Sequence, residues 1–179
     1  MAKLNIITAP DPRLKVKSRP VARVDARIRR LMDDMLETMY AAPGIGLAAP
    51  QVGVAERVIV LDLAHEGEAP QPHRLANPEL VWVADEDATY NEGCLSLPEH
   101  YADVTRPNAI KVRYLDYEGE IRELAAEGLL ATCIQHEMDH LDGVLFVDHL
   151  SALKRNIILR KLVKARKTGA PTPAGAAVL

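Results

Sequence analysis

The sequence has little cysteine, no long apolar run and no large excess of charge of one sign. Two cysteines in 179 residues are too few for a disulfide framework, and they favour a reducing compartment in which a thiol is free to bind metal. No apolar run approaches the roughly 20 residues that a membrane-spanning helix needs. A net charge of -3 argues against a surface built for DNA or anionic lipid, so we expect neither partner, although a local basic patch is compatible with it.

The remaining composition is typical of a globular protein. With 48% hydrophobic and 26% charged residues, the chain is expected to bury a full core, which excludes a disordered chain and a collagen-like fibre. Its length predicts a single domain over residues 1–167, followed by a flexible tail over 168–179. The start, MAKLNIITAPDPRL, lacks the charged and apolar regions of a secretory signal.

Apolar periodicity predicts helices near both ends of the chain. Residues 10–24 carry three prolines and predict an irregular arm. A first helix, capped by Asp25, is expected where apolar residues then recur at helical spacing: Ile28, Leu31, Met32, Met35, Leu36 and Met39. Another helix is expected over about 129–141, closed by Gly143, and a last one from Ser151 to about Lys167.

The segments between these helices predict a sheet. Residues 43–51 contain two glycines and two prolines, which predict a tight, shaped loop. Strands are expected at 58–63, 80–83, 110–114 and 121–124, with Glu118-Gly119 as a hairpin turn. We therefore predict an α+β fold, with mainly antiparallel sheets packed around the helix over 129–141.

That central helix carries the pattern H-E-x-x-H at residues 136–140. Side chains four residues apart lie one turn above each other, so His136 and His140 can hold one metal ion, while Glu137 can take a proton from water beside it. A solvated helix face with two surface histidines is the alternative. Apolar flanks argue against that alternative, and they are formed by Leu130, Ile134, Met138 and Leu141.

A catalytic site of this kind needs a third protein ligand and one open position. Cys133 lies seven residues before His140, a helical rise of roughly 10 Å, so its thiol is better interpreted as part of a pocket lining. Cys94 is the better candidate, because a loop or edge strand can bring it over the helix. The remaining histidines lack ligand-like spacing and are predicted to be surface or loop residues: His65, His73, His100 and His149.

Three motifs together resemble the peptide deformylase family. They are Gly44–Gln51 (GIGLAAPQ), Glu92–Ser96 (EGCLS) and Gln135–His140 (QHEMDH), in this order, and the opening Ile7–Leu14 (ITAPDPRL) is also similar. The resemblance covers about residues 4–165. Because the family-like start lies so close to Met1, we expect no organelle transit peptide and a bacterial cytoplasmic protein.

The resemblance implies removal of the formyl group from the N-terminal methionine of new polypeptides. It implies one divalent metal on Cys94, His136 and His140, with ferrous iron typical and zinc, nickel or cobalt as alternatives. The metal lowers the pKa of its water, and Glu137 accepts the proton and later returns it to the leaving amine. The side-chain amide of Gln51 and the backbone N–H of Leu95 then stabilise the oxyanion.

The family's peptide-binding site implies a set of substrate contacts. Two of them, Leu129 and Cys133, also share the helix stripe that carries the two histidines. One departure is visible, since this chain has Tyr101 where some members carry arginine, which removes a charged contact to the peptide backbone. The implied contacts are Ile45, Gly46, Tyr90, Glu92, Gly93, Leu129, Thr132 and Cys133.

The last helix is basic along one side. It is interpreted either as an amphipathic helix packed on the core or as a contact to ribosomal RNA. The basic residues are Lys154, Arg155, Arg160, Lys161, Lys164, Arg166 and Lys167, and the apolar side is Leu153, Ile157, Ile158, Leu162 and Val163.

Two other functions stay open. A zincin-like endopeptidase also uses H-E-x-x-H, but its third ligand normally lies downstream, whereas the candidate here is an upstream cysteine. A structural metal module or RNA-binding adaptor usually closes its metal site with four protein ligands, and the sequence offers only three well-placed ones.

Overall fold

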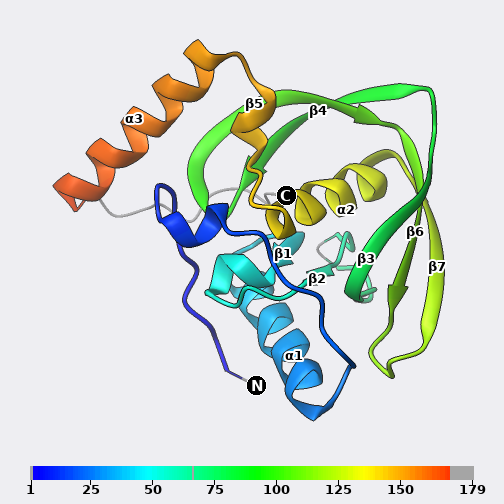
Figure 1. Cartoon of the computed structure of the whole chain (residues 1–179). Coiled ribbons are helices and arrows are strands. Elements are labelled where there is room, and N and C mark those ends of the chain that lie inside the picture. The colour runs from blue at the N-terminus through cyan, green and yellow to red at the C-terminus, as the bar shows by residue number, and fades with distance from the viewer. Residues whose placement is uncertain (1, 66, 170–179) are drawn as a thin grey trace.

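The computed structural model describes residues 2–65 and 67–169 and has an α+β architecture (Figure 1). The main sheet has the order β1-β2-β3-β6-β7, and all of its pairs are antiparallel. Its strands are β1 (Gly46–Ala48), β2 (Val58–Leu61), β3 (His73–Val83), β6 (Ala109–Leu115) and β7 (Ile121–Glu127). A separate antiparallel hairpin is formed by β4 (Asp87–Cys94) and β5 (Leu97–Pro107).

Three helices accompany the sheets: α1 (Ala26–Ala41), α2 (Gly128–Leu141) and α3 (Ala152–Thr168). The caps are those expected, because the side chains of Asp25 and Ser151 accept hydrogen bonds from the first turns of α1 and α3. Gly143, just past α2, has φ +73, the left-handed conformation that favours glycine at this position. None of the helices in the described ranges has the length and apolar character required to cross a bilayer.

Helix α2 lies at the centre of the molecule. One of its sides packs on the main sheet through a core that includes Ile134 and Leu141. The β4–β5 hairpin arches over its other side, and α1 packs beyond β1 and β2 (Figure 1). The predicted arrangement of antiparallel sheets around this helix is therefore confirmed.

Several regions differ from the sequence-based expectation. Strand β3 begins at His73, seven residues before the strand predicted at 80–83. Residues 43–51 are more regular than the loop predicted there, since they contain β1 and the 3-10 turn η2 (Ala49–Val52). The β4–β5 hairpin was not predicted, although it carries Cys94 at its inner end. The hairpin matters for function because it brings Cys94 above α2.

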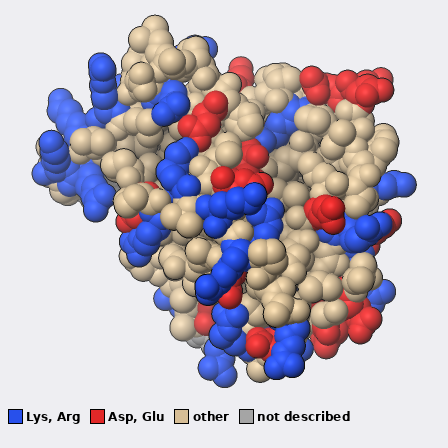
Figure 2. Space-filling model, in the orientation of Figure 1, with Lys and Arg blue, Asp and Glu red and all other residues tan. Residues whose placement is uncertain are grey.

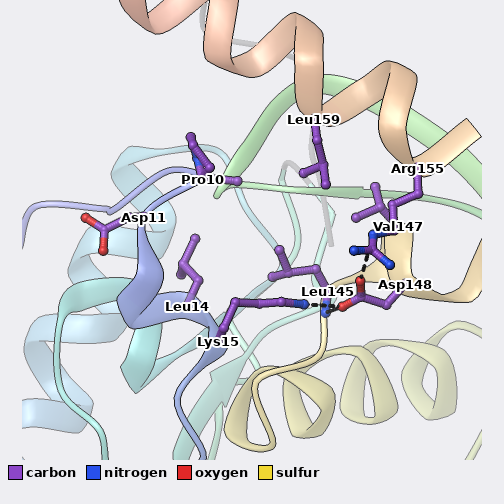
Figure 3. Close-up of a pocket in the computed structure, with 10 residues that line it drawn as sticks. Pro10, Asp11, Leu14, Lys15, Leu145, Val147, Asp148, Arg155 and Leu159 are labelled. Carbon is purple, nitrogen blue, oxygen red and sulfur yellow. Dashed lines mark hydrogen bonds and ion pairs between the residues drawn. The ribbon is translucent and has the colours of Figure 1, made fainter. Parts of the chain in front are cut away.

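Helix α3 projects from the body of the molecule (Figure 1). It packs through Leu162, Ile158 and Leu159, whereas Leu153 is 72% exposed and Ile157 44% exposed, so its apolar side is narrower than predicted. Between α3, the turn η1 (Pro12–Lys15) and the turn η3 (Phe146–His149) lies a pocket with an apolar lining (Figure 3). The tail predicted over 168–179 lies, beyond residue 169, outside the described residues.

Candidate metal and catalytic site

Helix α2 and the hairpin together form a cluster of three metal-binding side chains. Cys94 ends β4, and His136 and His140 lie one turn apart on α2. Their candidate ligand atoms all lie within 4.8 Å of one another, and Cys94 Sγ is 3.3 Å from His140 Nε2. All three residues are buried, so the spatial convergence expected from the motif spacing is present.

Glu92 fixes the orientation of His136. His136 Nδ1 lies 2.9 Å from Glu92 Oε2, and because a carboxylate accepts, the Nδ1–H donates and Nε2 keeps its lone pair. Both Glu92 oxygens also accept from Arg106, at 2.6 Å and 3.0 Å. Glu92 is fully buried in this pairing and supports His136, and the substrate contact that the resemblance implies for it stays a prediction.

Glu137 lies in a space that only glycine at position 46 leaves open. A Cβ on Gly46 would overlap Glu137 Oε1, and it would lie 2.9 Å from Glu137 Cδ and 3.0 Å from Cys133 Sγ. Glu137 is fully buried, and neither carboxylate oxygen has a hydrogen-bond partner among residues 2–65 and 67–169. A buried carboxylate in that state needs water or a cation to compensate its desolvation.

Gln51 faces the cluster from the turn η2. Its Oε1 accepts from the backbone N–H of Ala48 at 2.8 Å, which turns the amide NH2 toward the site. That Nε2 donates to Ser96 Oγ at 3.1 Å and lies 3.5 Å from Cys94 Sγ. Leu95, whose backbone N–H was the other expected donor, forms the turn between β4 and β5, and its side chain packs against Gly44.

Burial shifts the pKa of three groups at this site, Cys94, Glu137 and His140, toward the neutral form. Burial, followed by the charge of Glu137, raises the pKa of the Cys94 thiol, although the backbone N–H groups of Ser96 and Leu97 oppose the shift. Burial and the nearby Glu92 raise the pKa of Glu137. Burial and the neighbouring His136 lower the pKa of His140, which favours a neutral imidazole, the form that binds metal.

These residues fit a divalent cation. Two neutral imidazoles and one thiolate are a donor set that borderline-soft metals prefer. His136 Nε2 is buried and has no hydrogen-bond partner in the described part of the chain, as expected for an atom whose lone pair is a ligand. A positive ion would also stabilise the ionised forms of Cys94 and Glu137 that burial disfavours.

Comparison with known proteins decides the family. A sequence profile described as polypeptide deformylase matches residues 3–156. The chain belongs to the peptide deformylase family. It is 60% identical, over 167 residues, to the peptide deformylase of Phenylobacterium zucineum, a match that covers 93% of this chain and 99% of the relative. It is 55% identical over 166 residues to the peptide deformylase of Mesorhizobium japonicum, covering 93% and 94% of the two chains.

Solved structures agree with this assignment. The crystal structure of peptide deformylase from Ehrlichia chaffeensis superposes with a TM-score of 0.90 and 41% identity, and covers 95% of this chain and all of that one. A second structure of that enzyme, in complex with actinonin, gives a TM-score of 0.89 and 43% identity, covering 93% and 99%. Peptide deformylases are metal-dependent hydrolases that remove the formyl group from N-terminal methionine, and this chain is such a hydrolase.

The other residues implied by the resemblance lie on α2 and β4, the two elements that carry the cluster, or at and just before β1. Cys133 is buried, and its Sγ lies 3.8 Å from the carbonyl oxygen of Ile45. Thr132 and Gly93 are buried, Leu129 is 37% exposed, and half-buried Tyr90 has its hydroxyl next to Gly128. Tyr101 is exposed on β5.

The other histidines stay outside the metal cluster, but two of them are not the surface or loop residues predicted. His73 and His100 are half-buried within strands β3 and β5. His65 and His149 are exposed, as expected.

Sequence reasoning missed two residues that shape this site. Arg106 is 6% exposed, pairs with Glu92 and also donates to Asp139 Oδ2 at 2.8 Å. Phe146 stacks against His136, with ring centroids 6.3 Å apart and the planes at 24°. The alternation of Ala102, Val104 and Arg106 toward the interior of β5 was the available signal for Arg106.

Proposed function

We propose that this chain deformylates N-formyl-methionyl peptides at the Cys94, His136 and His140 cluster. The observation that carries the proposal is the meeting of these three donors beside the buried carboxylate of Glu137, which has no hydrogen-bond partner within the described residues. A formate-release assay on formyl-Met-Ala-Ser, after anaerobic purification and metal analysis, tests it. Release of formate supports the proposal, whereas cleavage of an internal bond in an acetyl-Met peptide would indicate an endopeptidase.

In the proposed mechanism Glu137 transfers the proton, and Gln51 and Leu95 stabilise the oxyanion by hydrogen bonds. A bound divalent metal supplies Lewis-acid chemistry and a water of lowered pKa. Glu137 accepts the proton of the attacking water and returns it to the departing amine, which leaves formate and a free N-terminus. The Gln51 amide and the backbone N–H of Leu95 donate to the developing oxyanion.

We assign ferrous iron as the physiological metal, with zinc, nickel or cobalt as substitutes. The assignment rests on the resemblance and on the Cys/His₂ donor set, which suits each of these ions. The thiolate ligand and the reducing conditions that it needs also favour a location in the bacterial cytoplasm, and the relatives described above are bacterial.

The methionine side chain of the substrate is proposed to enter a pocket beside α2. Its lining comes from both sides of the site, and the peptide would extend along the Ile45–Gly46 backbone at the edge strand β1, the mode by which a strand is added to a sheet. We take the lining residues to be Ile45, Gly46, Tyr90, Gly93, Leu129, Thr132 and Cys133.

Replacing Gly46 by alanine is expected to lower kcat about 100-fold. The new methyl group would overlap the Glu137 carboxylate and displace it, and a displacement of about 1 Å from reacting geometry costs about 10²-fold. Steady-state kinetics on formyl-Met-Ala-Ser measure the effect. Gly67→Ala is the control for kcat, because nothing lies within 4 Å of a Cβ there; its φ of +90 is expected to cost stability in that turn, so only kcat is compared. Equal kcat values for the two variants would contradict the placement of Glu137.

We further propose that α3 contacts ribosomal RNA. Its seven basic side chains are exposed, the segment contains no acidic residue, and basic side chains gather over it in Figure 2. A cluster of exposed basic side chains can neutralise the phosphates of RNA, and an enzyme that acts on new polypeptides works beside ribosomal RNA.

Neutralising α3 is expected to weaken ribosome binding and reduce its salt dependence. Each lost phosphate contact lowers the slope of log K against log salt by about 0.7–0.9. The variant replaces Arg160, Lys161, Lys164 and Lys167 by glutamine, which preserves Leu162 in the core. A control replaces four exposed basic residues outside α3: Lys3, Arg23, Arg30 and Lys111. An unchanged slope for the α3 variant would refute the contact.

A further inference from the structure

A continuous chain of hydrogen-bonded side chains runs from the surface to the metal ligand His136. His149 Nε2 lies 2.8 Å from Asp139 Oδ2, and the same oxygen accepts from Arg106 Nη1 at 2.8 Å. Arg106 then holds both oxygens of Glu92, and Glu92 accepts from His136 Nδ1. This series of hydrogen bonds therefore starts at η3, passes through Asp139 on α2, Arg106 on β5 and Glu92 on β4, and returns to α2 at His136.

Burial of the side chains increases from His149 toward Glu92 along this series of hydrogen bonds. The side chain of His149 is 37% exposed and that of Asp139 is 27% exposed, whereas Arg106 is 6% exposed and Glu92 is fully buried. A buried guanidinium must be compensated by carboxylates, because its desolvation is costly. Asp139 supplies the second carboxylate and is the only contact that ties Arg106 to α2 among the described side-chain hydrogen bonds.

The outer residues thus determine where the inner ones lie. Without Asp139, Arg106 keeps Glu92 as its sole charged partner and loses its anchor on the helix that carries both histidines. Glu92 in turn sets which nitrogen of His136 carries the proton and how the ring is turned. His149 restrains Asp139 from the side of η3, and the adjacent Asp148 is itself paired with Lys15 and Arg155 (Figure 3).

We propose that Asp139 and His149 are positioning residues for the metal ligand His136 and act on it through Arg106 and Glu92. The proposal rests on the metal site described under the proposed function. It assigns no contact with substrate to either residue, so it predicts weaker metal binding and an altered metal geometry. It also gives the segment that leads into α3 a physical connection to the metal site.

The test measures the affinity of the purified chain for Co²⁺ by anaerobic competition with a chelator, together with the Co²⁺ absorption spectrum. Asp139→Ala is expected to weaken Co²⁺ binding about 10- to 100-fold, the usual effect of losing a residue that orients a ligand. His149→Phe should weaken it about two- to fivefold, as expected for a partly exposed pair. His149→Gln, whose amide N–H can still donate, should restore most of that loss.

The control is Asp142→Ala, at the end of the same helix, where Asp142 pairs with Arg57 and not with Arg106. It should leave the Co²⁺ affinity and spectrum unchanged. If His149 acts through Arg106, His149→Phe should add no further loss in an Arg106→Lys background.

A purely structural role makes a different prediction. His149→Phe would then lower the free energy of unfolding while the Co²⁺ affinity and spectrum of the folded chain stayed at wild-type values, and that result would overturn the inference. Because His149 is exposed, this variant decides the question even if Asp139→Ala does not fold. A wild-type chain that binds no Co²⁺ would instead contradict the proposed metal site itself.

Discussion

Replacing Glu137 by glutamine is expected to lower deformylation about 10⁴-fold while the chain keeps its metal. Glutamine has nearly the same shape as glutamate, so it fits the space beside Gly46, but it cannot accept the proton of the attacking water. The expected loss is at the upper end for general acid–base catalysis because the same carboxylate also returns the proton to the amine. Formate release measures the turnover, and metal analysis measures occupancy.

Glu123→Gln provides the matched control. Glu123 is an exposed glutamate on β7 that pairs with Arg113 on the neighbouring strand β6. We expect wild-type turnover for it. Deformylation by the Glu137→Gln variant within tenfold of wild type would refute the general-base role, and loss of the metal would instead mean that Glu137 stabilises the ion.

The result also separates the remaining alternatives. A structural metal module would show no turnover before or after this substitution and would keep its metal, because no chemistry depends on the carboxylate. The site geometry already argues against that alternative, since Cys94, His136 and His140 are three donors and Glu137 lies beside them without a partner in the described residues. An endopeptidase would be inactivated as well, so the choice of substrate, and not this variant, distinguishes it.

The two histidines were predictable because their geometry is local. A spacing of four residues on a helix fixes the relative position of His136 and His140 with no knowledge of the rest of the fold. The exclusion of Cys133 as a ligand followed from the same helical rise, and the structure places its thiol against Ile45 and Gly46, outside the three-residue cluster. Local periodicity also sufficed for α1, whose core face and Asp25 cap are as predicted.

The support around His136 was not predictable in the same way. Glu92 and Arg106 lie on two strands of a hairpin that the sequence analysis did not identify, and their contact with α2 depends on tertiary packing. Residues 87–94 mix exposed polar side chains with a glycine and have no strong apolar alternation, so the strand signal was weak. The resemblance implied only a substrate contact for Glu92, and its pairing with Arg106 and His136 became visible in the structure.

Gln51 illustrates what the resemblance contributed and what the structure adds. A lone glutamine in a loop carries no catalytic signal, and only the motif suggested its role. The structure shows why its amide has a defined orientation, because the N–H of Ala48 holds Oε1 and leaves the NH2 group to face Cys94 and Ser96. Such an oriented donor is preorganised, so it need not be rearranged when negative charge develops.

Replacing Gln51 by alanine is therefore expected to lower kcat about 10²- to 10³-fold, the usual cost of one oxyanion donor. The substitution also leaves the buried N–H of Ala48 without its acceptor, which should reduce the free energy of unfolding by about 1–3 kcal/mol. Thermal unfolding of the variant, followed alongside kinetics on formyl-Met-Ala-Ser, separates the two effects.

Ser96→Ala is the matched control for Gln51. It removes the hydroxyl that Gln51 Nε2 contacts in the free chain but leaves the amide and its bond to Ala48 in place. If the amide donates to the oxyanion, Ser96→Ala should retain kcat within about tenfold of wild type, since losing one hydrogen bond between neutral groups costs about 0.5–1.5 kcal/mol. Equal losses in the two variants would show that Gln51 matters only for the packing of η2 against the hairpin, and the oxyanion donor would then have to be sought elsewhere in the site.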